Sequence, residues 1–346
     1  MDKAIEILLS EASVPIRWRV EREILGRDKP ETVTRSELAQ WPQVIKNLNL
    51  LAGDCRFNFL HSSFDYALEN ICGELHDLGV RMGDGDLDHR IILYLDKLER
   101  IKKSDMPFAG FNASIITAAA TLVGFEDHPE VQKQVMDRLN FIYEFVEKFD
   151  PEVFYIPDPS DMSKIWKGKN EMVNFDIYDS NRGLSLPTIH DLYAWTGITD
   201  SVLRQKADKL VSFILSPEYQ ERIKPGFGTV KVNSGRYRGM GWSVHVPDWN
   251  GEPDVMNLST VFRFMEALIR FKSVKSHPWI KRTLAWLDSF TGEDGLCWIP
   301  KDSLKGSSPS YWVTGGRISL EPKPRTYRKR VLEATFRLHL IKRLGS

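Results

Sequence analysis

The chain has 346 residues, of which 42% are hydrophobic and 27% are charged, as in an ordinary soluble globular protein. Its 47 basic and 47 acidic side chains leave no net charge, which argues against a nucleic-acid binder that must displace counterions from phosphates. The best apolar run without charge, about residues 113–125, is roughly 13 residues and contains Ser and Thr, too short to span a membrane, and the N-terminus does not look like a signal peptide. We therefore expect a cytoplasmic protein with no integral membrane segment.

Three cysteines, Cys55, Cys72 and Cys297, are odd in number and have no close pair. They form neither a disulfide framework nor a zinc ribbon. A reducing compartment is the expected environment.

Helical periodicity dominates the chain. In residues 15–25 the apolar side chains recur three and four apart, with Pro15 in the first turn and Gly26 just past the end, which predicts a capped helix. Further helices are expected, in chain order, near 36–51, 63–79, 87–102, 112–123, 129–148, 187–196, 200–215, 257–272, 278–290 and 328–343. Strand patterns are scarce, and only 228–232 and 241–246 look extended.

Several helix pairs resemble one another, which predicts a repeating helix hairpin of about 45 residues. The sequence His128-Pro129 begins one such helix, and His277-Pro278 begins another. The apolar helix that precedes each of these helices ends at a glycine, which we call a glycine stop, because glycine tolerates the left-handed position that ends a helix. These stops are at Gly79, Gly124, Gly197 and Gly345. Such hairpins cannot bury both faces alone, so they stack or close into a ring.

Two long segments, 150–187 and 225–253, break the helical rhythm with many Gly, Pro and aromatic residues. Segments of this length are usually functional lids or linkers. Because similar hairpins resume after each one, we expect a single domain over residues 1–346. The helices of residues 1–35 are expected to pack on the ring.

The glycine-stop and proline-start hairpins resemble the terpenoid cyclase and protein prenyltransferase superfamily. The element Thr291–Trp298 is similar to the family's repeated Asp-Gly-x-Trp sequence with one extra residue, and the final helix is similar to the closing hairpin arm. The resemblance covers about residues 40 to 346. It implies an all-α, single-domain α/α toroid, a squalene cyclase-like barrel of helix hairpins with a central cavity.

The family's catalytic signatures are mostly missing. The nearest match to the class II acid motif is Asp176-Ile177-Tyr178-Asp179, in which Tyr178 stands where the proton-donating Asp should be. A phenol with a pKa near 10 cannot protonate an alkene as an activated carboxylic acid can. The class I metal motif is absent. The only set comparable to the prenyltransferase zinc ligands is Asp294, Cys297 and His339, whose spacing departs from the family's, so we expect no metal and no cofactor.

Four residues are candidate catalytic groups. Asp176 and Asp179, three apart, can share a proton and give a general acid, or they can cap a turn and the next helix. The segment 236–249 mixes aromatic, basic and titratable groups and supplies His245 and Asp248 as proton donors or acceptors. The two long segments are expected to meet at one mouth of the ring, with all four side chains facing one cavity within about a dozen ångströms.

Other side chains are candidates for ligand binding. Aromatic faces line apolar pockets and stabilise cations, and the candidate substrate-binding residues are Tyr178, His190, Trp242, Trp249, Tyr311 and Trp312. His190 has the alternative of a simple core contact. A basic cluster near the end of the chain contains Arg325, Arg328 and Arg330, which suit phosphate or diphosphate, with a solvated helix start as the alternative.

Three functions stay open. The leading interpretation is a terpenoid cyclase-like enzyme that holds an apolar small molecule, such as an isoprenoid, in an aromatic-lined cavity, with lyase or isomerase acid–base chemistry and no redox cofactor. The second is a hydrolase or lyase acting on carbohydrate, since such enzymes also use α/α barrels with Trp platforms and paired acids. The third is a binding or scaffold protein that kept the toroid and lost the chemistry.

Overall fold

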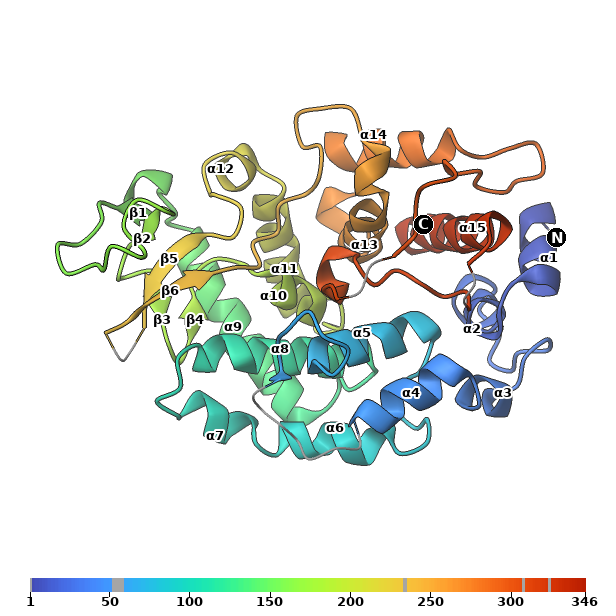
Figure 1. The fold of residues 1–346 in the computed structure, drawn as a ribbon, viewed down its shortest axis with the longest axis horizontal. Helices are drawn as coiled ribbons and strands as arrows, with labels where there is room; N and C mark the ends of the chain where they lie inside the picture. Colours follow the sequence, from blue (N-terminus) through green and yellow to red (C-terminus); the bar gives the residue numbers. More distant parts are fainter. Residues whose placement is uncertain (1, 52–58, 233–234, 307–308, 323–324) are drawn as a thin grey trace. The chain divides into compact units, whose positions relative to one another are not determined.

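The computed structural model describes residues 2–51, 59–232, 235–306, 309–322 and 325–346. Helices make up about half of this part of the chain and its strands are short, so the protein belongs to the mostly-α class (Figure 1). The closed ring and its central cavity stay predictions. The chain forms two compact units, and each is described by itself. The first comprises Met1–Ile91, Leu122–Gly124 and Pro247–Ser346, and the second comprises Ile92–Thr121 and Phe125–Val246.

The first unit is built almost entirely from helices. Its elements are α1 (Lys3–Glu11), α2 (Val14–Arg19), the π-helical η1 (Val20–Ile24), α3 (Arg35–Ala39), α4 (Pro42–Leu51), α5 (Leu68–Leu78), α13 (Leu258–Leu268), α14 (Pro278–Asp288), α15 (Tyr327–Gly345) and the 3-10 turns η4 (Val255–Asn257), η5 (Lys272–Val274) and η6 (Trp312–Thr314). Helix α13 packs on α15, and α5 packs on α4 and η6. The N-terminal α1 and η1 also pack on α15, so the first residues of the chain are part of this core.

The second unit combines helices with two small sheets. Its helices are α7 (Leu98–Lys102), α8 (Ala109–Leu122), α9 (Pro129–Val146), α10 (Ile189–Trp195), α11 (Ser201–Ile214) and α12 (Pro217–Gln220), with the 3-10 turn η3 (Pro151–Val153). Helix α6 (Leu87–Leu95) and the last residue of α8 cross the division between the units. Helix α9 packs on α10 and α11.

Both sheets lie within the second unit. One has the order β1-β2-β5-β6, from β1 (Tyr155–Ile156), β2 (Met172–Val173), β5 (Gly228–Lys231) and β6 (Tyr237–Met240). Strands β5 and β6 are antiparallel, with Gly228 opposite Met240, whereas β2 and β5 are parallel. The other sheet is the hairpin of β3 (Tyr178–Asp179) and β4 (Gly183–Leu184).

The predicted helices at 129–148, 200–215 and 278–290 are confirmed by α9, α11 and α14. The predicted helix at 36–51 is two helices, because Pro42 begins α4 instead of continuing α3. The strand predicted at 228–232 is confirmed by β5, but the one at 241–246 is wrong. Trp242 has a φ of 77°, a left-handed conformation that ends the extended chain just after β6.

The predicted helix starts are confirmed in atomic detail. The imidazole Nδ1 of His128 accepts a hydrogen bond from the N–H of Glu130 at 3.3 Å, and that of His277 accepts one from Trp279 at 3.2 Å. The glycine stops are confirmed only in part. Gly79 and Gly124 are left-handed, with φ of 84° and 94°. Helix α10 ends just before Gly197, as predicted, but this glycine is not left-handed. Gly345 is the last helical residue of α15, so the stop predicted there is wrong.

Candidate active site

One face of helix α5 carries two buried acids with a glycine between them. Glu69, Gly73 and Asp77 recur every fourth residue and therefore lie on the same face. Both acids are 2% exposed. A Cβ atom at position 73 would collide with the ring of Trp312, so glycine lets the start of η6 pack directly on this face. The segment that contains Tyr311 and Trp312 thereby covers the two acids.

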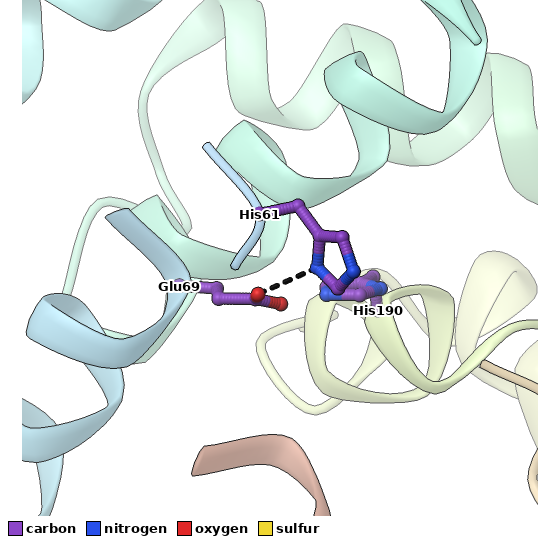
Figure 2. Close-up of side chains that lie close together, drawn as sticks. All are labelled: His61, Glu69 and His190. Carbon is purple, nitrogen blue, oxygen red and sulfur yellow. Dashed lines mark ion pairs between the residues drawn. The ribbon is translucent and has the colours of Figure 1, made fainter. Parts of the chain in front are cut away.

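At the N-terminal end of α5, a buried carboxylate holds an imidazole. Nδ1 of His61 lies 2.6 Å from Oε1 of Glu69 (Figure 2). The same carboxylate oxygen accepts a hydrogen bond from the N–H of Ser62 at 3.2 Å. Glu69 is buried, whereas 26% of the His61 side chain is exposed. The carboxylate therefore fixes the orientation of an imidazole that a small molecule can reach.

A phenol completes this cluster. The ring of Tyr311 stacks on the imidazole of His61, with centroids 5.0 Å apart and planes 14° from parallel. Burial, reinforced by the negative charge of Glu69, raises the pKa of Tyr311. The hydroxyl consequently keeps its proton at neutral pH. Tyr311 was predicted to bind substrate, and here it stands beside two further groups able to exchange or steer protons.

The loop that carries His61 is fastened by side chains from two other segments. Nδ2 of Asn70 donates to the carbonyl oxygens of Ser62 and Phe64 at 2.8 and 2.9 Å, and Oδ1 of Asn70 accepts from the N–H of Trp312 at 2.8 Å. Arg317 adds a bond from Nη2 to the carbonyl of Ser63 at 2.6 Å. One amide therefore ties together the loop, the helix and the Tyr311 segment, which keeps the three groups in a fixed arrangement.

At the other end of the same face, Asp77 is the centre of a buried ion network. Arg263 donates to both of its oxygens at 2.8 and 2.7 Å, and Arg337 donates at 3.3 Å. The indole N–H of Trp312 donates to Asp77 at 3.1 Å. Burial alone would raise the pKa of Asp77, but the two arginines hold it well below the usual range. Trp312, predicted to bind substrate, is thus a fully buried part of this network.

The predicted acid motif lies in the second unit and serves a turn. Oδ1 of Asp179 accepts hydrogen bonds from the N–H groups of Asn181 and Arg182 at 2.8 and 2.7 Å, which caps the turn between β3 and β4. Asp176 is exposed, and its N–H donates to Asn174 at 3.1 Å. The alternative role of a turn cap is therefore confirmed for Asp179, in a hairpin turn and not at the start of a helix.

Tyr178 and Asp179 line a cavity of about 330 Å³ in the second unit, together with Lys231. Burial raises the pKa of Tyr178 to about 12, which takes the phenol further from any ability to protonate an alkene. Asp176 and His245 are not among the residues that line this cavity. Of the predicted catalytic residues of the second unit, Asp179 alone is among the cavity's described lining residues.

His245 and Asp248 each have defined hydrogen-bond partners. Nδ1 of His245 lies 2.8 Å from Oγ of Ser243 and Nε2 lies 2.8 Å from the carbonyl oxygen of Ile223, while burial lowers its pKa. Asp248 belongs to the first unit and accepts hydrogen bonds from Nδ2 of Asn257 at 3.0 Å and the N–H of Asp254 at 2.9 Å. Both side chains brace their own loops. Their predicted catalytic role stays a prediction.

Three of the remaining aromatic candidates lie in ring contacts. His190, also drawn in Figure 2, belongs to α10 in the second unit, where the rings of Phe111 and Trp242 lie 5.2 and 6.1 Å from its own. It is 1% exposed, as expected of a core contact. Trp249, in the first unit, stacks on His277 at 5.4 Å. Substrate binding by His190, Trp242 and Trp249 stays a prediction.

The three arginines proposed to bind phosphate contact their own chain. Arg325 pairs with Glu333 at 2.6 Å, and Arg328 pairs with Glu11 at 2.8 Å. Arg330 donates to the carbonyl oxygens of Arg325 and Lys301. The predicted phosphate site stays a prediction.

Burial and protein contacts define the surroundings of the three residues compared with zinc ligands. Oδ1 of Asp294 accepts from the indole N–H of Trp298 at 3.0 Å and thereby holds the Thr291–Trp298 loop. Cys297 is buried, and burial raises its pKa to about 12. Nδ1 of His339 lies 3.9 Å from Asp2. Cys55 lies outside the described residues.

No family model matches this chain, no curated protein matches it, and no solved structure matches it. The resemblance to the toroid superfamily thus rests on the sequence and stays a prediction. In the part of the chain that the structure describes, none of the helices has both the length and the apolar character that a membrane span requires.

His61 and Glu69 are absent from the residues that the sequence predicts as a site. A signal for Glu69 is nevertheless present, because acids at positions 69 and 77 flank Gly73 at a spacing that places all three on one helix face. A buried helix face with acids at this spacing must find partners from elsewhere in the chain. His61 has no comparable signal, since its partner is reached through a loop.

Proposed function

We propose that this protein is an enzyme of the lyase or isomerase type that moves a proton on a small organic substrate. The observation that carries the proposal is the contact of His61 with the buried Glu69, with Tyr311 stacked on the imidazole. His61 acts as the base, and Glu69 orients the ring and stabilises the imidazolium that forms. Tyr311, which keeps its proton, donates a hydrogen bond or a proton to an oxygen of the substrate.

The strength of His61 as a base and of Tyr311 as an acid limits which substrates can react. An imidazole removes a proton from carbon only where a neighbouring carbonyl or carboxylate takes up the negative charge. We therefore propose a substrate with a C–H bond next to such a group. Cyclisation of an isoprenoid by alkene protonation suits this site less well, because it requires an acid much stronger than imidazolium or phenol.

Aromatic rings in the same loop suit the apolar part of a small molecule. The rings of Phe59 and Tyr66 lie 4.7 Å apart, and those of Phe64 and Tyr66 lie 5.4 Å apart. Phe64 is 51% exposed and Tyr66 is 43% exposed. Exposed ring faces also stack on sugars, so elimination on an acidic polysaccharide is the second candidate function. In that case the activated C–H bond is next to the carboxylate of a uronic acid.

Proton exchange in D2O tests the proposal and separates the two substrate classes. The wild-type protein is incubated with a panel of β-hydroxy ketones and with oligosaccharides of uronic acids, and NMR follows the proton next to the carbonyl or carboxylate. We expect loss of this signal on one class, slowed about a hundredfold or more by His61→Gln and less by Tyr311→Phe. His89→Gln, an exposed histidine on α6, is the matched control. Equal exchange with His61→Gln and wild type contradicts the proposal.

A second measurement needs no substrate. NMR of protein labelled with ¹⁵N-histidine observes the ring of His61 directly. The chemical shifts of the two ring nitrogens show whether Nδ1 donates to Glu69, and Glu69→Gln should move them, because it removes the carboxylate that orients the ring. If they do not move, Glu69 only braces the loop through Ser62, and the protein is a binding or scaffold protein as in the third interpretation.

A further inference from the structure

A groove of about 420 Å³ lies in the second unit, along the N-terminal half of α9, the end of α10 and the start of α11. Its volume is that of an ordinary small-molecule site. Most of its wall is apolar, and the apolar side chains that carry the argument are Val131, Val135, Met136, Ala194, Ile198 and Leu203. The groove shares no residue with the cluster of His61, Glu69 and Tyr311.

One polar atom in this apolar wall lacks a partner. Oε2 of Glu126 is buried and has no hydrogen-bond partner among the described residues. The Glu126 side chain packs directly on the backbone of Gly197, because a Cβ atom at Gly197 would lie 2.7 Å from Cβ of Glu126 and from Cγ2 of Thr121. A buried carboxylate oxygen without a donor is costly. A small rotation of the carboxyl group brings this oxygen to a donor on a ligand in the groove, which removes the cost.

The other charged groups of the groove have partners within the chain. Lys133 is the only basic side chain among its described lining residues, and it pairs with Glu99 at 2.9 Å. Asp200 caps α11 by accepting hydrogen bonds from the N–H groups of Val202 and Leu203 at 3.0 and 2.9 Å. A ligand with a carboxylate would therefore meet two acids and a lysine that is already paired. The charges favour a ligand whose polar end is a donor.

We propose that this groove binds an apolar small molecule whose polar end donates a hydrogen bond to Glu126. Alcohols and ammonium groups share this donor chemistry, and both are compatible with the wall. The apolar chain of the ligand lies against α9, α10 and α11. This inference is independent of the proton-transfer activity proposed for the first unit.

The probes are 1-decanol, decylamine and decanoate, which have the same apolar chain and different polar ends. Each competes with the dye Nile red on the full-length protein, and dye fluorescence gives its dissociation constant. We expect 1-decanol, decylamine or both to bind about tenfold or more tightly than decanoate. Glu126→Gln keeps an acceptor and removes the charge, so it distinguishes an alcohol site, which survives, from an ammonium site, which weakens.

Two tryptophan variants of neighbouring residues locate the binding. Leu203→Trp fills the groove and should weaken the preferred ligand about tenfold or more. Val202→Trp is the control, because Val202 is 61% exposed and does not line the groove. Circular dichroism confirms that both variants fold. Equal binding of the three probes, no binding at all, or equal binding to folded Leu203→Trp and Val202→Trp overturns the proposal.

Discussion

The two units bury charge in different ways. In the first unit, acids and arginines from α5, α13 and α15 form one network in which most members have two or more partners. Its members are Asp77, Arg263, Glu266, Glu333 and Arg337, all 6% exposed or less. In the second unit, Arg138 of α9 and Asp191 of α10 form a buried pair, with distances of 3.0 and 2.9 Å.

Backbone groups complete the pair of the second unit. Arg138 also donates to the carbonyl oxygens of Arg182 and Leu186 at 3.1 and 3.3 Å. Asp191 also accepts from the N–H and the hydroxyl of Thr188, both at 2.9 Å, and so forms a capping box at the start of α10. Here the charges join two helices and complete a helix end and a turn, whereas in the first unit they join three helices. Loss of one charge should accordingly cost more in the first unit.

The largest effect is expected for Asp77→Ala. This change leaves Arg263 and Arg337 buried without their shared carboxylate and removes the acceptor of the Trp312 indole. Breaking a buried ion pair from one side costs about 3–5 kcal/mol, so we expect the free energy of unfolding to fall by about 4 kcal/mol. Urea denaturation followed by circular dichroism measures it.

The control for this prediction is Asp86→Ala, because Asp86 pairs with Arg90 and is 79% exposed. A surface pair of this kind contributes about 1 kcal/mol or less. If Asp77→Ala costs no more than Asp86→Ala, the network does not hold the helices of the first unit together.

A smaller loss is expected for Asp191→Ala in the second unit. The change removes the partner of Arg138 and the capping box together, but two backbone carbonyls still accept from the guanidinium. We expect a loss of about 3 kcal/mol by urea denaturation. Thr188→Ala removes only the cap and should cost about 1 kcal/mol. Equal losses in the two variants would show that the ion pair itself contributes little.

The third prediction concerns the pH dependence of the first unit. Glu321 is 2% exposed and accepts from the N–H of Ser13 at 2.9 Å, next to α2. Burial, with a smaller contribution from Glu333, raises its pKa to about 7, from 4.5 in the unfolded chain. Between these values the folded state holds a proton that the unfolded state releases, so stability falls as the pH rises from about 4.5 to 7. The expected fall is about 3 kcal/mol.

Glu321→Gln should abolish this fall, because glutamine stays neutral and still accepts from Ser13. Below about pH 4.5, the stability of both wild type and Glu321→Gln should fall as the pH is lowered. Burial alone would raise the pKa of Glu23, but Arg19 lowers it to about 2. The ionised Glu23 therefore stabilises the folded state, and this stabilisation is lost as the pH falls from about 4.5 towards 2. Urea denaturation at a series of pH values measures both limbs. A fall above pH 4.5 that persists unchanged in Glu321→Gln rules out this carboxyl as its cause.

The difference between the units also shows which features of the fold and the site can be predicted from the sequence. The helices and their caps could be predicted, because spacing of apolar residues and a residue such as Asp200 act within a few positions. The buried network could not, since arginine and glutamate are ordinarily exposed, and Arg337 looks like part of an amphipathic closing helix. The cluster joins His61 and Glu69, which are close in the sequence, to Tyr311, which is far from both. Only tertiary packing brings these together.

The smallest effect is expected where the sequence predicts a phosphate site. Arg325 and Arg328 belong to the same basic cluster, but Arg325 is buried against Glu333, whereas the Arg328 side chain is 38% exposed beside Glu11. Arg328→Ala should therefore change the free energy of unfolding by less than about 1 kcal/mol and Arg325→Ala by more. High salt should shrink the first effect and spare the second, because exposed pairs are screened. Thermal unfolding with inorganic phosphate, compared with chloride at equal ionic strength, completes the test. If phosphate raises the unfolding temperature more than chloride does, and Arg328→Ala removes this difference, Arg328 binds phosphate in addition to pairing with Glu11.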